Sequence, residues 1–290
     1  MKSAKFFEKG TVFSLEVFPP KRTNPVESIS GALEAFSALA PDFISVTYGA
    51  AGSNNSEKTL EIVNTIRTKF GVEGVAHLAC VNLSRERARE ILGEMKALGI
   101  ENVLALRGDI PAGAEPLGEF RHASDLVEFI KGESADFNVL AACYPEGHFE
   151  CANLVEDIKN LRKKVDAGVD HLVSQLFFDN DFFYAFLERC ELAGIDVPVE
   201  AGIMPVVNKK QIERMATLCR VKLPKKFVAM MERYEHNALA MRDAGIAYAV
   251  DQIVDLVSQG VRGIHLYTMN NPYIAQRIHE ATASLIRCAC

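Results

Sequence analysis

The feature of this sequence that most constrains its fold is a repeated alternation of short apolar runs with longer segments of helical periodicity. Short apolar runs bounded by turn residues are typical of strands that are buried on both faces, as in a parallel sheet. The alternation predicts eight strands, at residues 12–18, 43–46, 74–78, 103–106, 139–143, 172–176, 197–204 and 263–267.

The segments between these runs carry apolar residues at helical spacing. The clearest is residues 154–168, where Leu154, Ile158, Leu161 and Val165 form one apolar face. The other predicted helices cover residues 29–39, 56–69, 84–99, 125–131, 179–193, 210–219, 227–233, 244–259 and the chain from 274 onward.

No composition break or linker divides the chain, so we expect one domain over residues 1–290. Strands that alternate with helices predict an α/β fold, and an eight-stranded barrel typically needs about 250 residues plus insertions. The sequence therefore predicts a single eight-stranded parallel α/β (TIM) barrel. A doubly wound open sheet is the structural alternative.

Composition excludes several classes of protein. No apolar run reaches the roughly 18 residues that a membrane helix needs, and the N-terminus lacks the apolar stretch of a signal peptide. The seven cysteines are odd in number and form no Cys-x-x-Cys pair, which favours a cytoplasmic protein with reduced thiols. The net charge of −6 disfavours a nucleic-acid binder.

Polar residues lie at or just after the C-terminal ends of seven of the eight predicted strands. In a barrel the ligand site lies at the C-terminal ends of the strands, so these side chains are expected to meet around one pocket. The most unusual of them are Arg107 and Asp109, which leave a buried strand through Gly108; a salt bridge between two loops explains that pair equally well. The polar strand ends are Glu16, Thr47, His77, Arg107 with Asp109, Tyr144, Gln175 and Tyr267.

Several kinds of site are not indicated. His77, Cys80 and His265 lack the standard spacing of zinc ligands, and no metal site is expected. The serine-hydrolase elbow, the P-loop and the Gly-x-Gly-x-x-Gly dinucleotide motif are absent, so barrel loops would have to hold any nucleotide cofactor. The polar stripe of Asp157, Asn160 and Lys164 on one predicted helix is suited to ribose and diphosphate, although a solvated face also explains it.

Six motifs in order resemble the methylenetetrahydrofolate reductase family, in its short bacterial form with only the catalytic barrel. They are SLEVFPP at 14–20, VTYGA at 46–50, LRGD at 106–109, ACYPEGH at 142–148, KVDAG at 164–168 and YTMN at 267–270. The resemblance covers nearly the whole chain. It implies a flavin-dependent barrel that reduces 5,10-methylenetetrahydrofolate to 5-methyltetrahydrofolate with electrons from NADH or NADPH.

The resemblance also implies roles for individual residues. Glu16 matches the general acid that protonates folate nitrogen N10, and Asp109 matches a catalytic aspartate that contacts the pterin near the flavin. Gln175 matches a glutamine shared by folate and nicotinamide, and Gln211 matches a further folate contact. Desolvation at the barrel mouth favours the protonated carboxyl that a general acid needs.

The implied cofactor is FAD rather than FMN, and if both substrates use one flavin face they must bind in turn, in a ping-pong cycle. Arg107 would supply a cation for the diphosphate or the reduced flavin. The matched flavin-binding positions are Thr47, Tyr48, Ala50, His77, Arg107, Gly108, Asp109, Ala123, Tyr144, His148, Asp157, Asn160, Lys163 and Lys164.

The chain departs from the family at a few positions. Asn271 stands where many members have a folate-binding arginine, and Met215 where some have a phenylalanine that stacks on substrate. Cys288 and Cys290 lie in the C-terminal tail, which is either inert or a contact for an iron–sulfur or zinc partner subunit. We also expect a homo-oligomer.

Two further questions stay open at this level. The basic run at residues 209–226 is either a solvated helix face or a patch that attracts anionic folates and dinucleotides. A non-redox pterin-binding methyltransferase or corrinoid-partner barrel is the alternative function.

Overall fold

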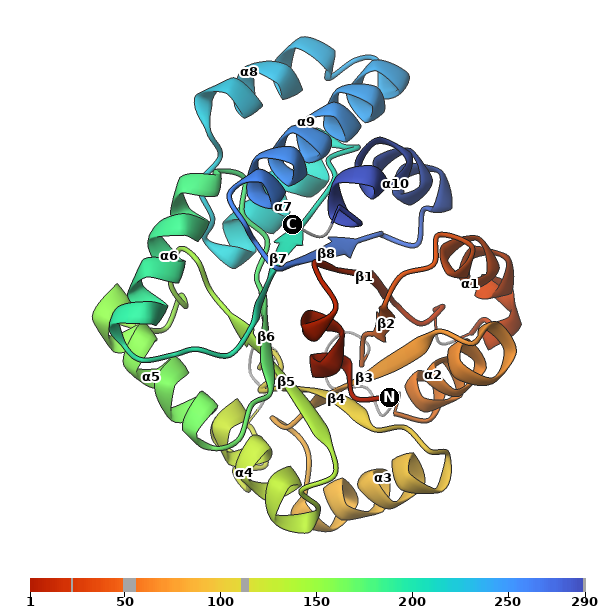
Figure 1. Cartoon of the computed structure of the whole chain (residues 1–290), viewed down its shortest axis with the longest axis vertical. Helices are drawn as coiled ribbons and strands as arrows, with labels where there is room; N and C mark the ends of the chain where they lie inside the picture. Colours follow the sequence, from red (N-terminus) through yellow and green to blue (C-terminus); the bar gives the residue numbers. More distant parts are fainter. Residues whose placement is uncertain (22, 49–55, 111–114, 289–290) are drawn as a thin grey trace.

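The protein folds into a closed barrel of parallel strands that follow one another in chain order around the ring. The computed structural model describes residues 1–21, 23–48, 56–110 and 115–288 (Figure 1). The predicted eight-stranded parallel α/β barrel is confirmed, and the open-sheet alternative is wrong. The strands are β1 Val12–Val17, β2 Phe43–Val46, β3 Glu73–Ala79, β4 Asn102–Leu106, β5 Asn138–Cys143, β6 His171–Ser174, β7 Val199–Ile203 and β8 Gly263–Tyr267.

Helices surround the barrel on its outer side (Figure 1). They are α1 Ser30–Ser37, α2 Ser56–Phe70, α3 Arg85–Ala97, α4 Ala123–Glu133, α5 Leu154–Asp166, α6 Asn180–Leu192, α7 Lys209–Cys219, α8 Lys225–Tyr234, α9 Ala238–Ser258 and α10 Pro272–Ile286, with short 3-10 helices η1 Ser3–Glu8 and η2 Val26–Ile29. In the described part of the chain, none of the helices combines the length and apolar character needed to cross a membrane.

The helix predicted at residues 244–259 begins six residues earlier in the structure, at Ala238. The side chain of Asn237 caps this helix by accepting a hydrogen bond of 3.0 Å from the backbone N–H of Ala240. An asparagine at this position satisfies one of the free N–H groups of the first turn, which stabilises the earlier start. Apolar periodicity alone does not reveal such a start.

Side chains of each strand alternate between the barrel interior and the helices outside. In β1, Phe13, Leu15 and Val17 belong to the large core between strands and helices, while Val12 belongs to a separate cluster inside the barrel. That inner cluster forms an apolar layer made by Phe7, Val12, Phe43, Val75, Leu104, Leu140 and Val173. Above this layer the interior becomes polar, which positions the candidate site.

The N-terminal opening of the barrel is covered by η1, which lies across the ring of strands in Figure 1. The backbone N–H of Ser3 donates to Asn102 Oδ1 at 2.7 Å, and Asn138 Nδ2 donates to Ser3 Oγ at 2.8 Å. Phe7 inserts into the inner apolar cluster and is 3% exposed. This 3-10 helix, which closes one end of the barrel, was not predicted from the sequence.

Candidate active site

Glu16 lies near the C-terminal end of β1, with its side chain 20% exposed at the barrel mouth. Its Oε2 atom is 3.7 Å from His77 Nε2 on β3 and 3.8 Å from His265 Nε2 on β8. Both separations are longer than hydrogen bonds. The structure therefore brings together Glu16 and His77, two of the predicted strand-end residues, and adds His265.

His77 is buried, and this burial lowers its pKa to about 4, against the smaller opposing effect of Glu16. The imidazole is therefore neutral at neutral pH. Its Nε2 atom is buried without a hydrogen-bond partner among the described residues. Buried polar atoms are rarely left in this state, so His77 has capacity to bind a ligand group at the barrel mouth.

The loop after β8 fixes the backbone around Glu16. Thr268 Oγ1 donates to the carbonyl oxygen of Glu16 at 2.7 Å. The Asn270 amide accepts from the N–H of Phe18 at 3.1 Å and donates to its carbonyl oxygen at 2.8 Å. Met269 and Asn270 adopt φ angles of +50° and +52°, which are uncommon for residues other than glycine. The position of the carboxyl group thus depends on a strained loop from the last strand.

Tyr267 extends across the mouth from β8 to β6, where its hydroxyl donates to the carbonyl oxygen of Ser174 at 2.7 Å. Gly202 on β7 makes this path possible, because a Cβ atom there would lie 2.8 Å from the tyrosine ring and 2.3 Å from that same oxygen. Burial raises the pKa of Tyr267, so it stays a hydrogen-bond donor at neutral pH. The polar end of β8 thus lies against the end of β6, directly before Gln175.

Arg107 and Asp109 follow β4 but do not pair with each other by a hydrogen bond. Both terminal nitrogens of the Arg107 guanidinium instead bind the carboxylate of Glu150, with Nη2 donating at 2.9 Å. This bond raises the pKa of Arg107 and lowers that of Glu150. Gly108 has φ +86°, and a Cβ atom there would lie 3.1 Å from Ala79 Cβ, so the turn requires glycine. Asp109 is exposed.

The expected cofactor residues after β5 form a connected group with the first turns of α5. Asp157 is buried, and its Oδ1 accepts from the backbone N–H of His148 at 3.2 Å. The rings of Tyr144 and His148 meet edge to face at 4.7 Å between centroids. Burial raises the pKa of Tyr144 and lowers that of His148.

The cations of α5 belong to the same group. Lys164 Nζ donates to the carbonyl oxygen of Ala142 at 2.7 Å, and burial lowers its pKa. Lys163 Nζ donates to Asn160 Oδ1 at 3.3 Å on the exposed part of the helix. The polar stripe of α5 is therefore partly folded against the β5 loop and only partly solvated.

The remaining predicted residues are more dispersed. Thr47 and Tyr48 follow β2, while Gln175 directly follows β6 and its Oε1 accepts from the N–H of Leu176 at 2.8 Å. Ala123 is the first residue of α4, and Gln211 is exposed on α7; no described hydrogen bond joins either to Glu16. Ala50 lies outside the described residues.

The positions that depart from the family have structural roles of their own. Asn271 caps α10, and its Oδ1 accepts from the N–H of Ile274 at 3.3 Å. Met215 packs against the apolar cluster around α7 and α8. Cys288 is an exposed free thiol after α10, whereas Cys290 lies outside the described residues. Within the described ranges, no three His, Cys, Asp or Glu side chains are arranged to hold a metal ion.

A buried polar cluster below Glu16 was missed from the sequence. Ser14 Oγ lies 2.6 Å from His265 Nδ1 and also donates to Glu200 Oε2, while His171 Nε2 lies 3.3 Å from Glu200 Oε1. Glu200, His171 and His265 are at most 1% exposed. The available signal was the charged Glu200 within the apolar run predicted as the seventh strand.

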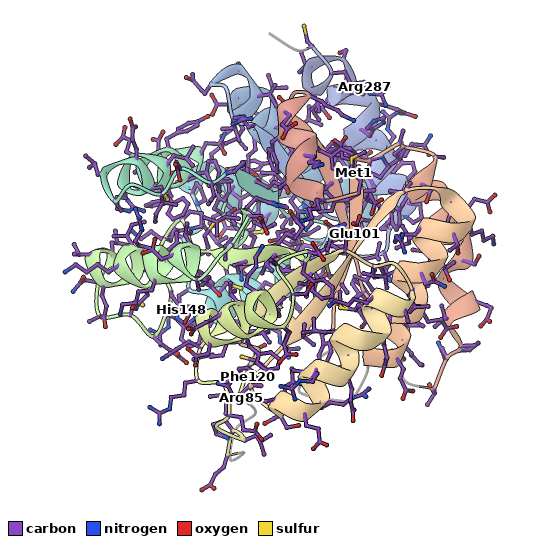
Figure 2. The ribbon with its side chains drawn as sticks, turned by 60° about the horizontal axis from the view of Figure 1, so that its bottom comes forward. Met1, Arg85, Glu101, Phe120, His148 and Arg287 are labelled. Atoms are coloured by element: carbon purple, nitrogen blue, oxygen red, sulfur yellow. The ribbon has the colours of Figure 1, made fainter. Side chains whose placement is uncertain are left out.

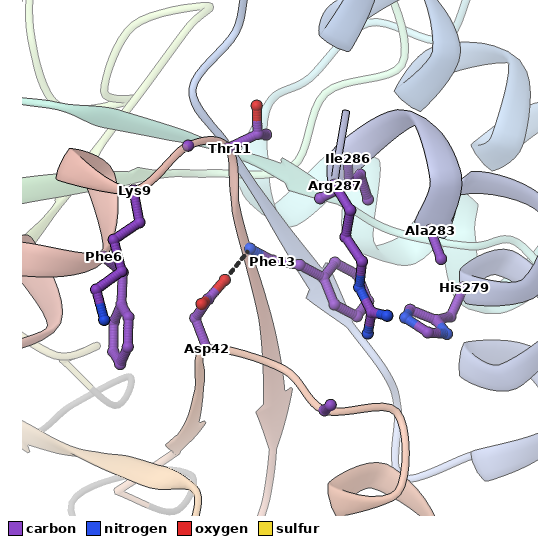
Figure 3. A pocket seen from close by; sticks show the side chains of 11 residues that line it. Phe6, Lys9, Thr11, Phe13, Asp42, His279, Ala283, Ile286 and Arg287 are labelled. Carbon is purple, nitrogen blue, oxygen red and sulfur yellow. Dashed lines mark hydrogen bonds between the residues drawn. The ribbon is translucent and has the colours of Figure 1, made fainter. Parts of the chain in front are cut away.

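A separate cavity lies at the opposite end of the barrel (Figure 3). Its walls include Lys9 and Thr11 before β1 and His279 and Arg287 on or next to α10. The carboxylate of Asp42 accepts a 2.8 Å hydrogen bond from the backbone N–H of Phe13 at its edge. The cavity lies beside the start of β1, so it is not part of the site around Glu16.

Comparison with known proteins gave consistent relatives over nearly the whole chain. The family model described as methylenetetrahydrofolate reductase matches residues 2–283. The chain is 36% identical over 266 residues to 5,10-methylenetetrahydrofolate reductase of Pectobacterium carotovorum subsp. carotovorum, covering 91% of this chain and 88% of the relative. The Escherichia coli K12 enzyme of the same name is 36% identical over 265 residues, with the same coverage.

Two further matches support more limited conclusions. Methylenetetrahydrofolate reductase (NADH) 1 of Arabidopsis thaliana is 38% identical over 274 residues, but the match spans 46% of that longer protein. Among solved structures, an uncharacterized protein from Clostridium thermocellum that binds two copies of 5-methyl-5,6,7,8-tetrahydrofolic acid aligns with a TM-score of 0.68 over 98% of this chain and 99% of its own. At 13% sequence identity that likeness shows the fold alone.

Proposed function

Because the chain belongs to the methylenetetrahydrofolate reductase family, we propose that this oxidoreductase works through a bound flavin, FAD rather than FMN, with NADH or NADPH as the electron donor. The family resemblance seen in the six sequence motifs is confirmed by these relatives. They are named as reductases, which supports reduction of methylenetetrahydrofolate over the non-redox methyltransferase alternative.

The observation that carries this proposal is the placement of Glu16. Its carboxyl group is partly buried at the mouth, its backbone is fixed by Thr268, and its nearest titratable neighbour His77 is neutral. A positioned carboxylic acid is what the folate reaction needs, because opening the five-membered ring requires a proton at N10 as the carbon–nitrogen bond breaks. We propose that Glu16 donates this proton.

The residues around the mouth fit a flavin. His77 Nε2 is a buried nitrogen without a partner among the described residues, and Gly108 keeps the backbone after β4 free of a side chain. For the ribose and diphosphate, Asn160 and Lys163 offer an exposed amide and an exposed cation, while Asp157 and Lys164 already contact the β5 loop and support that face of α5. When bound, the flavin supplies hydride transfer between nicotinamide and folate, which would use it in turn.

The Arg107–Glu150 pair would affect cofactor binding, and three exposed or strand-end side chains would bind the folate. A diphosphate at Arg107 would compete with Glu150, so cofactor binding is expected to break the Arg107–Glu150 pair. For the folate we propose contacts from Asp109, Gln175 and Gln211. The exposure of Asp109 and Gln211 leaves both side chains accessible to a ligand.

The test begins with the purified protein and its absorption spectrum. We expect a flavin band that bleaches anaerobically with NADH or NADPH and returns on addition of methylenetetrahydrofolate. A protein that never takes up flavin would instead favour the pterin-binding methyltransferase or corrinoid-partner barrel. A bound flavin that neither nucleotide reduces would indicate a partner protein as the electron donor.

A further inference from the structure

The buried cluster beneath Glu16 contains a hydroxyl group that must be shared between two neighbours. Ser14 Oγ donates to Glu200 Oε2 and lies 2.6 Å from His265 Nδ1. A serine hydroxyl has one proton to give and can accept through its lone pairs. When that proton goes to the Glu200 carboxylate, the contact with His265 is a hydrogen bond only if Nδ1 carries the proton.

This placement of the proton determines what His265 presents to Glu16. In the neutral imidazole only one ring nitrogen is protonated, so a proton on Nδ1 leaves a lone pair on Nε2. Nε2 is the atom that lies 3.8 Å from Glu16 Oε2 and 3.5 Å from Ser45 Oγ. The serine hydroxyl at position 45 can donate or accept, so it is compatible with either tautomer.

We propose that Glu200 and Ser14 are positioning residues that hold His265 in its Nδ1–H tautomer, so that an unprotonated Nε2 faces Glu16 and favours its protonated carboxyl. The tautomer follows from contacts within the chain. Its consequence for catalysis rests on the role of Glu16 as the acid proposed above. A lone pair beside a carboxyl group stabilises the form that has a proton to donate.

Every titratable group near the cluster bears on this balance. Glu16 and His77 lie on the mouth side, and His171 lies on the inner side, between Phe7 and Phe43 and 3.3 Å from Glu200 Oε1. Asp42 and Tyr267 are close enough that Glu200 and Glu16, respectively, contribute to raising their pKa values. The carboxylate of Glu200 is thus the acceptor that orders Ser14, with His171 as its second neighbour.

Replacing Glu200 with glutamine should reverse the chain of hydrogen bonds. The amide nitrogen of Gln can donate to Ser14 Oγ, which frees the serine proton for His265 Nδ1. The ring then carries its own proton on Nε2, facing Glu16, and stabilises the ionised carboxylate instead. Glu200→Gln should therefore lower the pH above which folate reduction declines, by up to about one unit, because His265 Nε2 and Glu16 Oε2 interact across 3.8 Å rather than through a hydrogen bond.

The first experiment reads the tautomer directly, without reference to activity. Long-range ¹H–¹⁵N correlation spectra of protein labelled at histidine, with His265 assigned from its loss in His265→Gln, should show Nδ1–H in the wild type and Nε2–H in Glu200→Gln. A wild-type His265 protonated at Nε2, or at both nitrogens, would overturn the inference. Because this result needs no variant of Glu200, it stands even where that variant does not fold.

Ser14→Ala offers a second variant, since it removes the hydroxyl but keeps both end groups. His265 should then show both neutral tautomers, whereas an unchanged Nδ1–H signal would count against the bridge. Glu73→Gln is the matched control: Glu73 is a partly buried glutamate near the start of β3, at the other end of the barrel. It should leave the His265 signals and the pH profile unchanged.

The two proposals can fail separately. In stopped-flow experiments, Glu200→Gln should shift the pH profile of flavin reoxidation by methylenetetrahydrofolate and leave reduction by the nicotinamide unchanged. If Glu16→Gln slows reoxidation selectively while Glu200→Gln changes neither tautomer nor profile, only the present inference is wrong. If Glu16→Gln has no selective effect, the acid is misassigned whatever the tautomer of His265.

Discussion

Polar side chains lie at both ends of the barrel, but their hydrogen bonding differs between the N-terminal end, closed by η1, and the open C-terminal end around Glu16. At the N-terminal end, Asn102 accepts from Ser3 N–H at 2.7 Å and donates to the carbonyl oxygen of Met1 at 3.0 Å, and the terminal amino group pairs with Glu101 at 2.9 Å. At the C-terminal end, Glu16 and His77 stand 3.7 Å apart and His77 Nε2 has no partner among the described residues. Figure 2 shows Met1 beside Glu101, with His148 and Phe120 well away from them.

This difference distinguishes polar side chains that support the fold from those that are available to a ligand. A buried polar atom without a partner costs roughly 1–3 kcal/mol, so a stable protein completes such bonds where it has nothing to gain from leaving them open. At the N-terminal end η1 completes them for Asn102 and Asn138, whereas both ring nitrogens of His171, whose ring lies against Phe7, have no hydrogen-bond partner among the described residues. At the mouth, His77 Nε2 has no hydrogen-bond partner among the described residues, which is consistent with a ligand that binds there.

The largest effect should come from Glu16→Gln at the open end. Glutamine keeps the shape of the side chain but cannot donate a carboxyl proton, so reoxidation by methylenetetrahydrofolate should slow by at least ~10²-fold. Flavin reduction by the pyridine nucleotide should stay near normal, because that half-reaction needs no acid. Stopped-flow absorbance separates the two halves.

Glu101→Gln is the control for this experiment at the closed end, where Glu101 contacts the terminal amino group. It should leave both half-reactions unchanged. Equal slowing of both half-reactions in Glu16→Gln would mean that the carboxylate maintains the geometry of the site. The polar groups at the C-terminal end would then have a structural role, like those at the N-terminal end.

Asn102→Ala, at the N-terminal end, should reduce stability without changing the half-reactions. It leaves the Ser3 N–H without its acceptor in a buried position, so the free energy of unfolding in urea should fall by about 2–3 kcal/mol. Both half-reactions of the folded enzyme should be unaffected. Asn24→Ala, at an exposed asparagine, should be neutral for stability. A loss of activity in folded Asn102→Ala would break the division between the ends.

His77 should contribute acid sensitivity at the open end. Its folded-state pKa of about 4 is below the ordinary value of 6.5, so the unfolded chain takes up a proton first as the pH falls through that window. The wild type should lose on the order of 1–2 kcal/mol of stability from this group between pH 6.5 and 4.5. His77→Gln should lack that part of the loss in urea unfolding at the two pH values. Identical losses would show that His77 is not buried as described.

The smallest effect is expected from the basic segment at residues 209–226. At least four of its cations already have partners. Lys209 pairs with Glu235 at 2.8 Å, and Arg220 Nη1 donates to the carbonyl oxygen of Phe149 at 3.1 Å. Lys226 pairs with Asp251 at 3.3 Å, and the Lys222 ammonium lies 4.9 Å from the centre of the Phe182 ring. Neutralising Lys222, Lys225 and Lys226 together should raise the KM for polyglutamylated folate by only about twofold at low salt, with no effect at high salt.

The control for this experiment is neutralisation of Lys2, Lys5 and Lys9 near the closed end. That triple variant should leave KM unchanged at every ionic strength. An equal rise in KM from both sets would attribute the effect to net charge, and an unchanged constant in both would leave the basic segment a solvated face.

The features that could be predicted from the sequence are those determined by residues close together in the chain or by a general rule of the fold. The strands and helices follow from apolar periodicity, and the meeting of Glu16 with His77 follows from the rule that strand ends converge. It missed the polar interior, because Glu200 in an apolar run has no local partner and its neighbours Ser14 and His265 come from other strands. The pairing of Arg107 with Glu150, 43 residues away, was equally inaccessible.

The seam between β1 and β8 has a consequence for how the protein is made. Glu16 belongs to the first strand, yet the hydroxyl of Thr268 that anchors it is 252 residues further along the chain. A growing polypeptide therefore exposes β1 long before the strand that completes its surroundings has left the ribosome. Contacts of such long range form late and slowly, and unpaired strand edges are prone to aggregation in the meantime. Glu16, the acid proposed above, is among the first residues synthesised and among the last to reach its final surroundings, so a chain cut short before residue 263 would contain Glu16 without Thr268 and the rest of the mouth.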